Sequence, residues 1–250
     1  GTVCDVVPLV GVNRALVRQG LQVMAQRRNV GLAALADVAR LKQPPGAYHL
    51  GFMLGPRVNA GGRVGQADLG ARLLSSEDPH EVGALAVRLD EFNAERRAIE
   101  REVLDQAIAR IEGLYGPDRK GLPSALLVES EGWHVGVIGI VASRLVERYG
   151  RPAFVVGMDG ALGKGSGRSV RGVDLGAAVI AARQAGLLVN GGGHAMAAGL
   201  TVARDSLPEL ARFLDGRIAP QLGAAPAVRE LGIDAALAPA AATQELVDMI

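Results

Sequence analysis

The sequence predicts an α/β protein in which a small helical region, one long helix and a compact domain of alternating strands and helices follow one another. Three observations indicate this order. Of the 250 residues, 49% are hydrophobic, which is enough to bury one large core or two modest ones, and we expect two. Apolar side chains recur at three- and four-residue spacing from Asp78 to Gly116. After Pro123, short apolar runs alternate with helical patterns, as in an α/β domain.

Charge and cysteine content narrow the classes of function. The chain has 27 Lys and Arg residues against 26 Asp and Glu, a net charge of +1, so any nucleic-acid site must be a local patch. The single cysteine, Cys4, excludes a disulfide framework within the chain. No apolar stretch approaches the roughly 20 residues that a membrane span requires, and no leader is evident. We therefore expect a cytoplasmic protein without a membrane partner.

The first element carries an unusual charge. Residues 2–7 are apolar and rich in β-branched side chains, which predicts a buried strand, and Asp5 is the one charge within it. Burying an unpaired carboxylate is costly, so such residues are usually paired or bound to metal. The alternative is a strand-end aspartate that caps a neighbouring turn. The chain opens on Gly1, and residues 231–250 read as the start of a helix, so we expect both ends to be truncations.

Helical periodicity follows in residues 13–20 and 31–41, with Gly20 as a predicted stop. Asp78-Pro79-His80-Glu81 then combines an N-cap, a proline at the first helical position and an acidic third position, which predicts a strong helix start. A helix that ends at Gly116 would span about 50 Å at about 1.5 Å per residue. Such a rod either pairs as a coiled coil or joins two lobes, and Arg96 in its apolar stripe favours the connector.

The second half predicts alternating elements. We expect strands at residues 125–128, 153–156 and 200–202, and helices at 137–149 and 174–185, followed by a linker at 221–227 and the start of a third unit. Trp133 is expected to pack inside, although stacking on a base is the alternative, and His134 is expected at a helix entrance.

Three glycine-rich segments carry candidate binding residues. Residues 54–64 place Arg57, Asn59 and Arg63 among glycines, and a guanidinium fork suits phosphate oxygens; the alternative is a helix-connecting loop whose arginines pair with surface carboxylates. Residues 163–169 offer an anion-binding concavity of small residues and cations, or else a flexible surface hairpin.

The third segment is Gly191-Gly192-Gly193-His194, followed by Ala195-Met196-Ala197-Ala198-Gly199. Here we expect a tightly folded backbone that brings the histidine ring close to a substrate. A lone histidine is more often a hydrogen-bonded structural residue, and that alternative stays open from the residues alone.

These segments, in this order, together with Gly1-Thr2-Val3-Cys4-Asp5, resemble motifs of the RecJ exonucleases in the DHH phosphoesterase superfamily, over roughly residues 1–204. The resemblance implies roles for individual residues. Asp5 would be a metal ligand. The phosphate of the strand would be gripped by side chains and backbone of the three segments: Arg57, Asn59, Arg63, Ser166, Arg168, Ser169, Gly192, Gly193 and His194. Of these, Arg168 and His194 would act on the reacting phosphate.

The resemblance also implies an organisation and an activity. Residues 1–75 would end a DHH domain, residues 76–116 would form the connecting helix, residues 121–218 the DHH-associated domain, and residues 226–250 the beginning of an OB-like domain. The whole protein would be a 5′→3′ exonuclease of single-stranded DNA in repair and recombination, working with two Mn²⁺ or Mg²⁺ ions. A single-strand-binding protein and a RecQ-type helicase would be its partners.

One family feature is absent from the sequence. No Asp-His-His triplet occurs, so we expect the remaining metal ligands before Gly1 and no catalysis by these 250 residues alone. Two alternatives stay open: a DHH phosphoesterase acting on short oligonucleotides or cyclic dinucleotides, and a RecJ-derived replication scaffold without catalysis. Residues 229–234, which read as an added segment, favour the exonuclease over the small-substrate enzyme.

Overall fold

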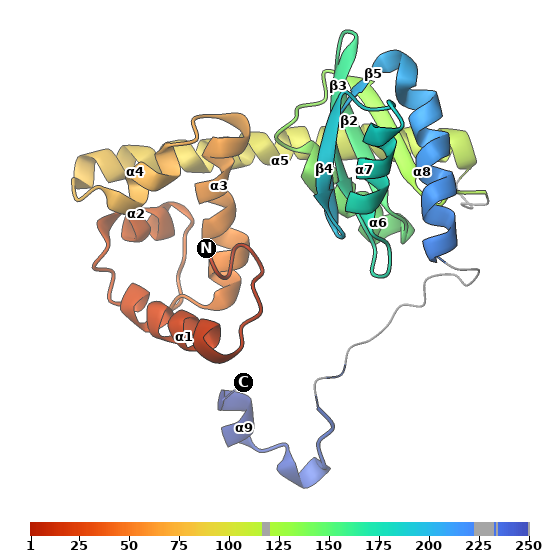
Figure 1. The fold of residues 1–250 in the computed structure, drawn as a ribbon. Helices are drawn as coiled ribbons and strands as arrows, with labels where there is room; N and C mark the ends of the chain where they lie inside the picture. The colour runs from red at the N-terminus through yellow and green to blue at the C-terminus, as the bar shows by residue number, and fades with distance from the viewer. Residues whose placement is uncertain (117–120, 223–232, 234, 250) are drawn as a thin grey trace.

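A long helix joins a helical N-terminal lobe to an α/β lobe (Figure 1). The computed structural model describes residues 1–116, 121–222, 233 and 235–249. The α/β class predicted from the sequence is confirmed by a five-stranded sheet with helices on both faces. None of the described helices is long and apolar enough to cross a membrane.

The long helix, α5, spans Pro79–Tyr115. Its predicted start is confirmed, because the Asp78 side chain accepts a hydrogen bond from the His80 N–H at 2.9 Å and Pro79 occupies the first turn. Gly116 ends the helix with a φ of 74°. The two ends of α5 belong to different cores, with Leu89 in the N-terminal core and Ile111 in the α/β core. The helix therefore connects two lobes, as the connector interpretation predicted.

The N-terminal lobe consists of short helices. They are α1 (Gly11–Ala25), α2 (Val30–Val38), the π-helix η1 (His49–Leu54), α3 (Gly55–Val64) and α4 (Leu69–Ser75). Of these, α2, α3 and α4 pack on the first half of α5. Leu35, Leu54 and Leu73 are fully or almost fully buried between them. The predicted stop at Gly20 is wrong, since α1 continues to Ala25. One glycine costs a helix only about 1 kcal/mol, which neighbouring turns offset.

The predicted strand at residues 2–7 is also wrong. This segment forms a turn with backbone hydrogen bonds from Asp5 N to Gly1 O at 2.9 Å and from Val7 N to Thr2 O at 3.1 Å, and Val6 is 86% exposed. A strand needs a neighbour for its N–H and C=O groups, and no described strand pairs with this segment. The backbone therefore satisfies its hydrogen bonds locally.

The α/β lobe contains a sheet of order β1-β2-β3-β5-β4. The strands are β1 (Leu126–Glu131), β2 (Ala153–Asp159), β3 (Leu162–Arg168), β4 (Asn190–His194) and β5 (Ala197–Ala203). β1 and β2 are parallel, and the other neighbours are antiparallel. Helix α6 (Ile138–Tyr149) packs with α5 on one face, while α7 (Leu175–Gln184) and α8 (Leu207–Leu222) cover the other.

The predicted apolar strands and the helices at α6 and α7 are confirmed, whereas α8 was not predicted. After α8 the structure describes a 3₁₀ turn at Pro239–Ala241 and α9 at Gln244–Met249. Residues 223–227 of the predicted linker, and all of the segment 229–234 except Ile233, lie outside the described residues.

The cap of α5 generates a stability prediction. Replacing Asp78 by Ala removes the hydrogen bond to the His80 N–H and should lower the free energy of unfolding by about 1 kcal/mol. Asp68→Ala is the matched control, because Asp68 precedes α4 without a side-chain capping bond. Urea denaturation of both variants measures the difference. Equal losses would show that the cap does not stabilise α5.

Candidate functional site

The open face of β3 carries the polar residues that the sequence singled out. Side chains alternate along a strand, and Gly163, Gly165 and Gly167 face the core, where an added Cβ would lie 2.4 to 2.6 Å from Met158, Leu200 and Phe154 atoms. Lys164, Ser166 and Arg168 therefore point to the opposite face, toward α6. The alternative of a flexible surface hairpin is correct only in that β3 forms a hairpin with β2, because β3 lies inside the sheet between β2 and β5.

Strand register extends these three positions into three rows across the open face. The rows are Lys164–Thr201–Asn190, Ser166–Gly199–Gly192 and Arg168–Ala197–His194. The middle row has no side chain beyond Ser166, and an added Cβ at Gly192 or Gly199 would meet nothing within 4 Å. The two glycines thus make an open floor. The hollow above it has a volume of about 590 Å³ and is also lined by Arg63 and Gly139.

Arg168 is the central cation of this hollow. Its Nη1 donates hydrogen bonds to Ser166 Oγ at 3.0 Å and to the Gly167 carbonyl at 2.9 Å, and it forms no ion pair within the part of the chain that the structure describes. Burial lowers the pKa of its guanidinium, and the charge of Arg63 lowers it further. Because a half-buried cation without a carboxylate remains uncompensated, this position favours an anion.

The first turn of α6 lies against the same pair. An added Cβ at Gly139 would come within 2.9 Å of Arg168 Nη2 and 3.0 Å of Ser166 Oγ, so a larger residue here would have to displace the ends of these two side chains. The N-terminus of a helix presents N–H groups and a partial positive charge. Arg168, Ser166 and the start of α6 therefore combine donors and positive charge on one side of the hollow.

His194 lies at the end of the third row, across Ala197 from Arg168. It is exposed at the end of β4, and its Nδ1 accepts a hydrogen bond from Met196 N at 3.4 Å. The expected tightly folded backbone is a β-hairpin instead, with residues 195 and 196 as the turn. His194 shares the face of Arg168 but lies outside the residues that line the hollow.

Residues 54–64 form helix α3 together with Leu54 of η1, so the loop of the alternative interpretation is wrong. Arg57 pairs with Asp90 at 2.7 Å and donates to the Met53 carbonyl at 2.6 Å, which agrees with the alternative that this arginine pairs with a carboxylate. Arg63 instead reaches the α/β lobe, where its Nη1 donates to the Gly136 carbonyl at 3.1 Å. Only Arg63 of these two lines the hollow with Arg168.

Asn59, Ser169 and Asp5 are placed away from the hollow. Asn59 lines a smaller hollow beside Cys4. Ser169 is buried and donates from Oγ to the Val173 carbonyl at 2.9 Å, so it holds the loop after β3. Asp5 is exposed in the N-terminal turn. No group of three or more His, Cys, Asp or Glu side chains among the described residues is placed to hold a metal ion, so these residues alone do not fit a metal centre.

The first row consists of Lys164, Thr201 and Asn190. The sequence placed Lys164 in the anion-binding segment without a role of its own, and sequence reasoning missed Asn190 and Thr201 as site residues. The period-two alternation of glycine with polar residues in β3 was the available signal.

Trp133 is buried and its Nε1 donates to Gln106 Oε1 at 2.7 Å, which confirms the packing interpretation. His134 is exposed, and its Nδ1 accepts from Gly136 N at 3.1 Å beside the hollow. Together the site offers donors and cations for an anionic ligand.

Comparison with known proteins shows what the chain is similar to. Residues 123–219 match the model of the DHHA1 domain. Over 84% of its length the chain is 39% identical to the single-stranded-DNA-specific exonuclease RecJ of Bacillus subtilis (strain 168), and over 100% it is 38% identical to that of Escherichia coli (strain K12). These matches span 26% and 44% of the two relatives, so the chain corresponds to less than half of each.

Solved structures agree with this likeness. The crystal structure of RecJ from Thermus thermophilus in complex with Mn²⁺ superposes with a TM-score of 0.77 at 34% identity, covering 88% of this chain and 31% of that one. The Mg²⁺ complex of the same protein gives a TM-score of 0.76 at 33% identity, covering 88% of this chain and 33% of that one. Metal ions are thus bound in this family.

The two adjacent glycines of β4 generate a matched prediction. An Ala at Gly193 would place its Cβ 2.3 Å from the Ala197 carbonyl oxygen, whereas an Ala at Gly192 would meet nothing within 4 Å. Gly193→Ala should therefore destabilise the β4–β5 hairpin by about 1 to 3 kcal/mol, as overpacking does, and Gly192→Ala should not. Thermal unfolding compares the variants. If Gly192→Ala lowers the melting temperature as much as Gly193→Ala, the assignment of faces fails.

Proposed function

Because the chain is RecJ-like over most of its length and carries a DHHA1 domain, we propose that it grips the sugar-phosphate backbone of single-stranded DNA within a metal-dependent 5′→3′ exonuclease. The observation that supports this most is Arg168, a half-buried guanidinium without a carboxylate partner among the described residues. It stands beside Ser166 on a floor of glycine, where a phosphate can approach backbone as well as side chains.

The chemistry of the face supports a phosphodiester over other anions. A guanidinium presents a planar fork of donors to two phosphate oxygens, and Ser166 Oγ adds a hydroxyl donor next to it. Lys164 and Arg63 add positive charge around the same hollow. Because successive phosphates are joined by a chain, cations spaced along one face bind a strand more tightly than an isolated anion.

In this proposal the residues of the chain bind and orient the strand. Arg168 and Ser166 hold a phosphate, and His194 in the same row approaches it from the far side of Ala197. Preorganised donors of this kind stabilise charge that develops on a reacting phosphate. The metal ions of the family supply activated water and charge neutralisation when bound. Asp5 is the ligand that we propose for this chain, and the two-metal centre belongs to the longer protein.

Repair and recombination follow from the family resemblance, whereas the cytoplasmic location follows from the cysteine content and hydropathy of the sequence, and both are part of the proposal. The same holds for a single-strand-binding protein and a RecQ-type helicase as partners.

A hollow of about 590 Å³ also has the size of a small-ligand site, which keeps short oligonucleotides as a second candidate substrate class. Dependence of affinity on strand length separates the two candidates.

Arg168 provides the direct test. Arg168→Ala should weaken binding of a fluorescent oligodeoxythymidylate to the full chain about tenfold or more, because a charge-assisted hydrogen bond contributes about 1.5 to 3 kcal/mol. The slope of log affinity against log salt should fall by about 0.7 for one lost contact with a single strand. Arg212→Ala, an exposed cation on α8, is the control. Equal affinity of the Arg168 variant and the control would contradict the proposal.

A further inference from the structure

A second hollow lies between the lobes, beside the middle of α5. It has a volume of about 530 Å³. The charged side chains that line it are five arginines and one carboxylate: Arg57, Arg96, Arg97, Arg101, Arg144 and Glu100. Neither the DHHA1 match nor the phosphate-gripping face of the sheet includes its α5 residues.

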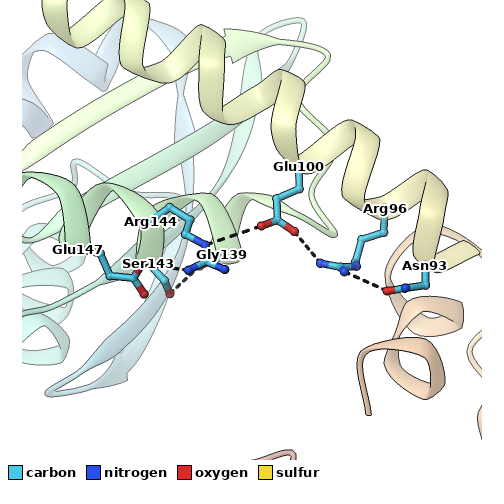
Figure 2. Close-up of polar contacts among 7 residues, drawn as sticks. All are labelled: Asn93, Arg96, Glu100, Gly139, Ser143, Arg144 and Glu147. Atoms are coloured by element: carbon cyan, nitrogen blue, oxygen red, sulfur yellow. Dashed lines mark hydrogen bonds and ion pairs between the residues drawn. The ribbon is translucent and has the colours of Figure 1, made fainter. Parts of the chain in front are cut away.

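Glu100 is shared between two helices in this hollow. Figure 2 shows it between Arg96 on α5 and Arg144 on α6. Its Oε2 accepts from Arg96 Nη1 at 2.6 Å, and its Oε1 lies 3.9 Å from Arg144 Nε. Arg96 Nη2 also donates to Asn93 Oδ1 at 3.0 Å, and Arg144 Nη1 pairs with Glu147 at 3.0 Å. One carboxylate therefore lies among several guanidinium groups.

Arg96 is incompletely satisfied by this network. Its Nε is buried and has no hydrogen-bond partner within the described structure. Burial lowers the pKa of its guanidinium despite Glu100, and the charges of Arg63, Arg97 and Arg144 lower it further. A buried N–H without an acceptor costs about 1 to 3 kcal/mol, so an additional acceptor at this place would be stabilising.

Arg97 and Arg101 leave the hollow with excess positive charge. The other three arginines have carboxylate partners in Asp90, Glu100 and Glu147. Arg97 and Arg101 form no ion pair within the described residues, and both are exposed. They are four residues apart on α5, a spacing at which like charges repel each other. An anion bound between them would remove this repulsion.

Neighbouring hollows share lining residues. Arg63 lines both the sheet hollow and a smaller one, and Arg96 lines both the smaller one and the hollow beside α5. A row of cations thus extends from Arg168 through Arg63 and Arg96 to Arg97 and Arg101. The sheet hollow and the hollow beside α5 lie at opposite ends of this row, so a strand bound in both would follow it.

We propose that the hollow beside α5 is a second phosphate subsite, at which Arg97, Arg101 and Arg96 bind the backbone of the same single strand several nucleotides from the phosphate held by Arg168. This inference rests on the proposed function, because it assumes that the strand is the ligand. Glu100 opposes the strand at this subsite, since its carboxylate neutralises the cations that a phosphate would contact.

Affinity measurements on the full chain test the subsite with variants of opposite expected sign. Arg97→Ala/Arg101→Ala should weaken binding of a twelve-nucleotide oligodeoxythymidylate about tenfold and lower its salt slope by about 1.4, for two lost contacts with a single strand. Glu100→Gln should strengthen that binding several-fold. Neither change should alter the affinity for thymidine 5′-monophosphate, whose single phosphate is expected at Arg168 and Ser166 and cannot span both subsites. Arg212→Ala/Arg217→Ala, which removes two exposed cations from α8, is the charge-matched control.

The outcomes separate the two proposals. One outcome is that the unmodified chain binds the twelve-nucleotide strand, Arg168→Ala weakens this binding, and Arg97→Ala/Arg101→Ala binds like its α8 control. This outcome refutes the second subsite and leaves the proposed function standing. If the unmodified chain does not bind the strand, both proposals fail. Thermal unfolding of each variant shows whether it is folded. If Glu100→Gln is unfolded, the paired arginine variant decides, because Arg97 and Arg101 are exposed and unpaired within the described residues.

Discussion

The arrangement of the molecule depends on α5, because this one helix contributes side chains to two separate cores. Leu89 and Phe92 are buried in the N-terminal lobe, while Val103 and Ile111 are buried in the α/β lobe. Between these apolar stretches α5 is polar, and Arg96 and Glu100 occupy its middle. The lobes therefore face each other across a charged segment of helix, which lines the hollow beside α5.

A second contact fixes how α3 meets the α/β lobe. An added Cβ at Gly136 would lie 2.1 Å from the Arg63 carbonyl oxygen, so the two backbones touch directly. The Arg63 side chain also donates a hydrogen bond to the Gly136 carbonyl. Since Gly136 precedes α6 and Arg63 lies in the last turn of α3, this contact brings a cation from the first lobe to the sheet hollow of the second. Glycine thus has two roles at this site. At Gly136 it lets two backbones approach closely, and at Gly192 and Gly199 it leaves the floor of the sheet hollow without side chains.

The sequence predicts secondary structure correctly where a run of apolar residues is buried or where a local cap marks the start of a helix. The apolar runs of β1 and β2 and the capped start of α5 are specified locally, and all three are present. Sequence reasoning failed at residues 2–7, because strand-forming residues do not specify a partner strand. β3 and β4 are rich in glycine and have little intrinsic preference for a strand, so only their neighbours in the sheet determine them. Arg57 and Arg63 show a further limit. Six residues apart on a helix, they point about 120° apart, and their roles separate once α3 is known to be helical.

The central claim is that one strand lies along the open face of β3, β5 and β4 and continues toward α5. Photo-cross-linking of an oligonucleotide containing 4-thiothymidine to the full chain, with the linked peptides identified by mass spectrometry, tests it most directly. The account predicts linked peptides from residues 163–169, from residues 190–201 and from the segment of α5 around residues 96–101. Cross-links confined to α7 and α8, on the opposite face of the sheet, would contradict it.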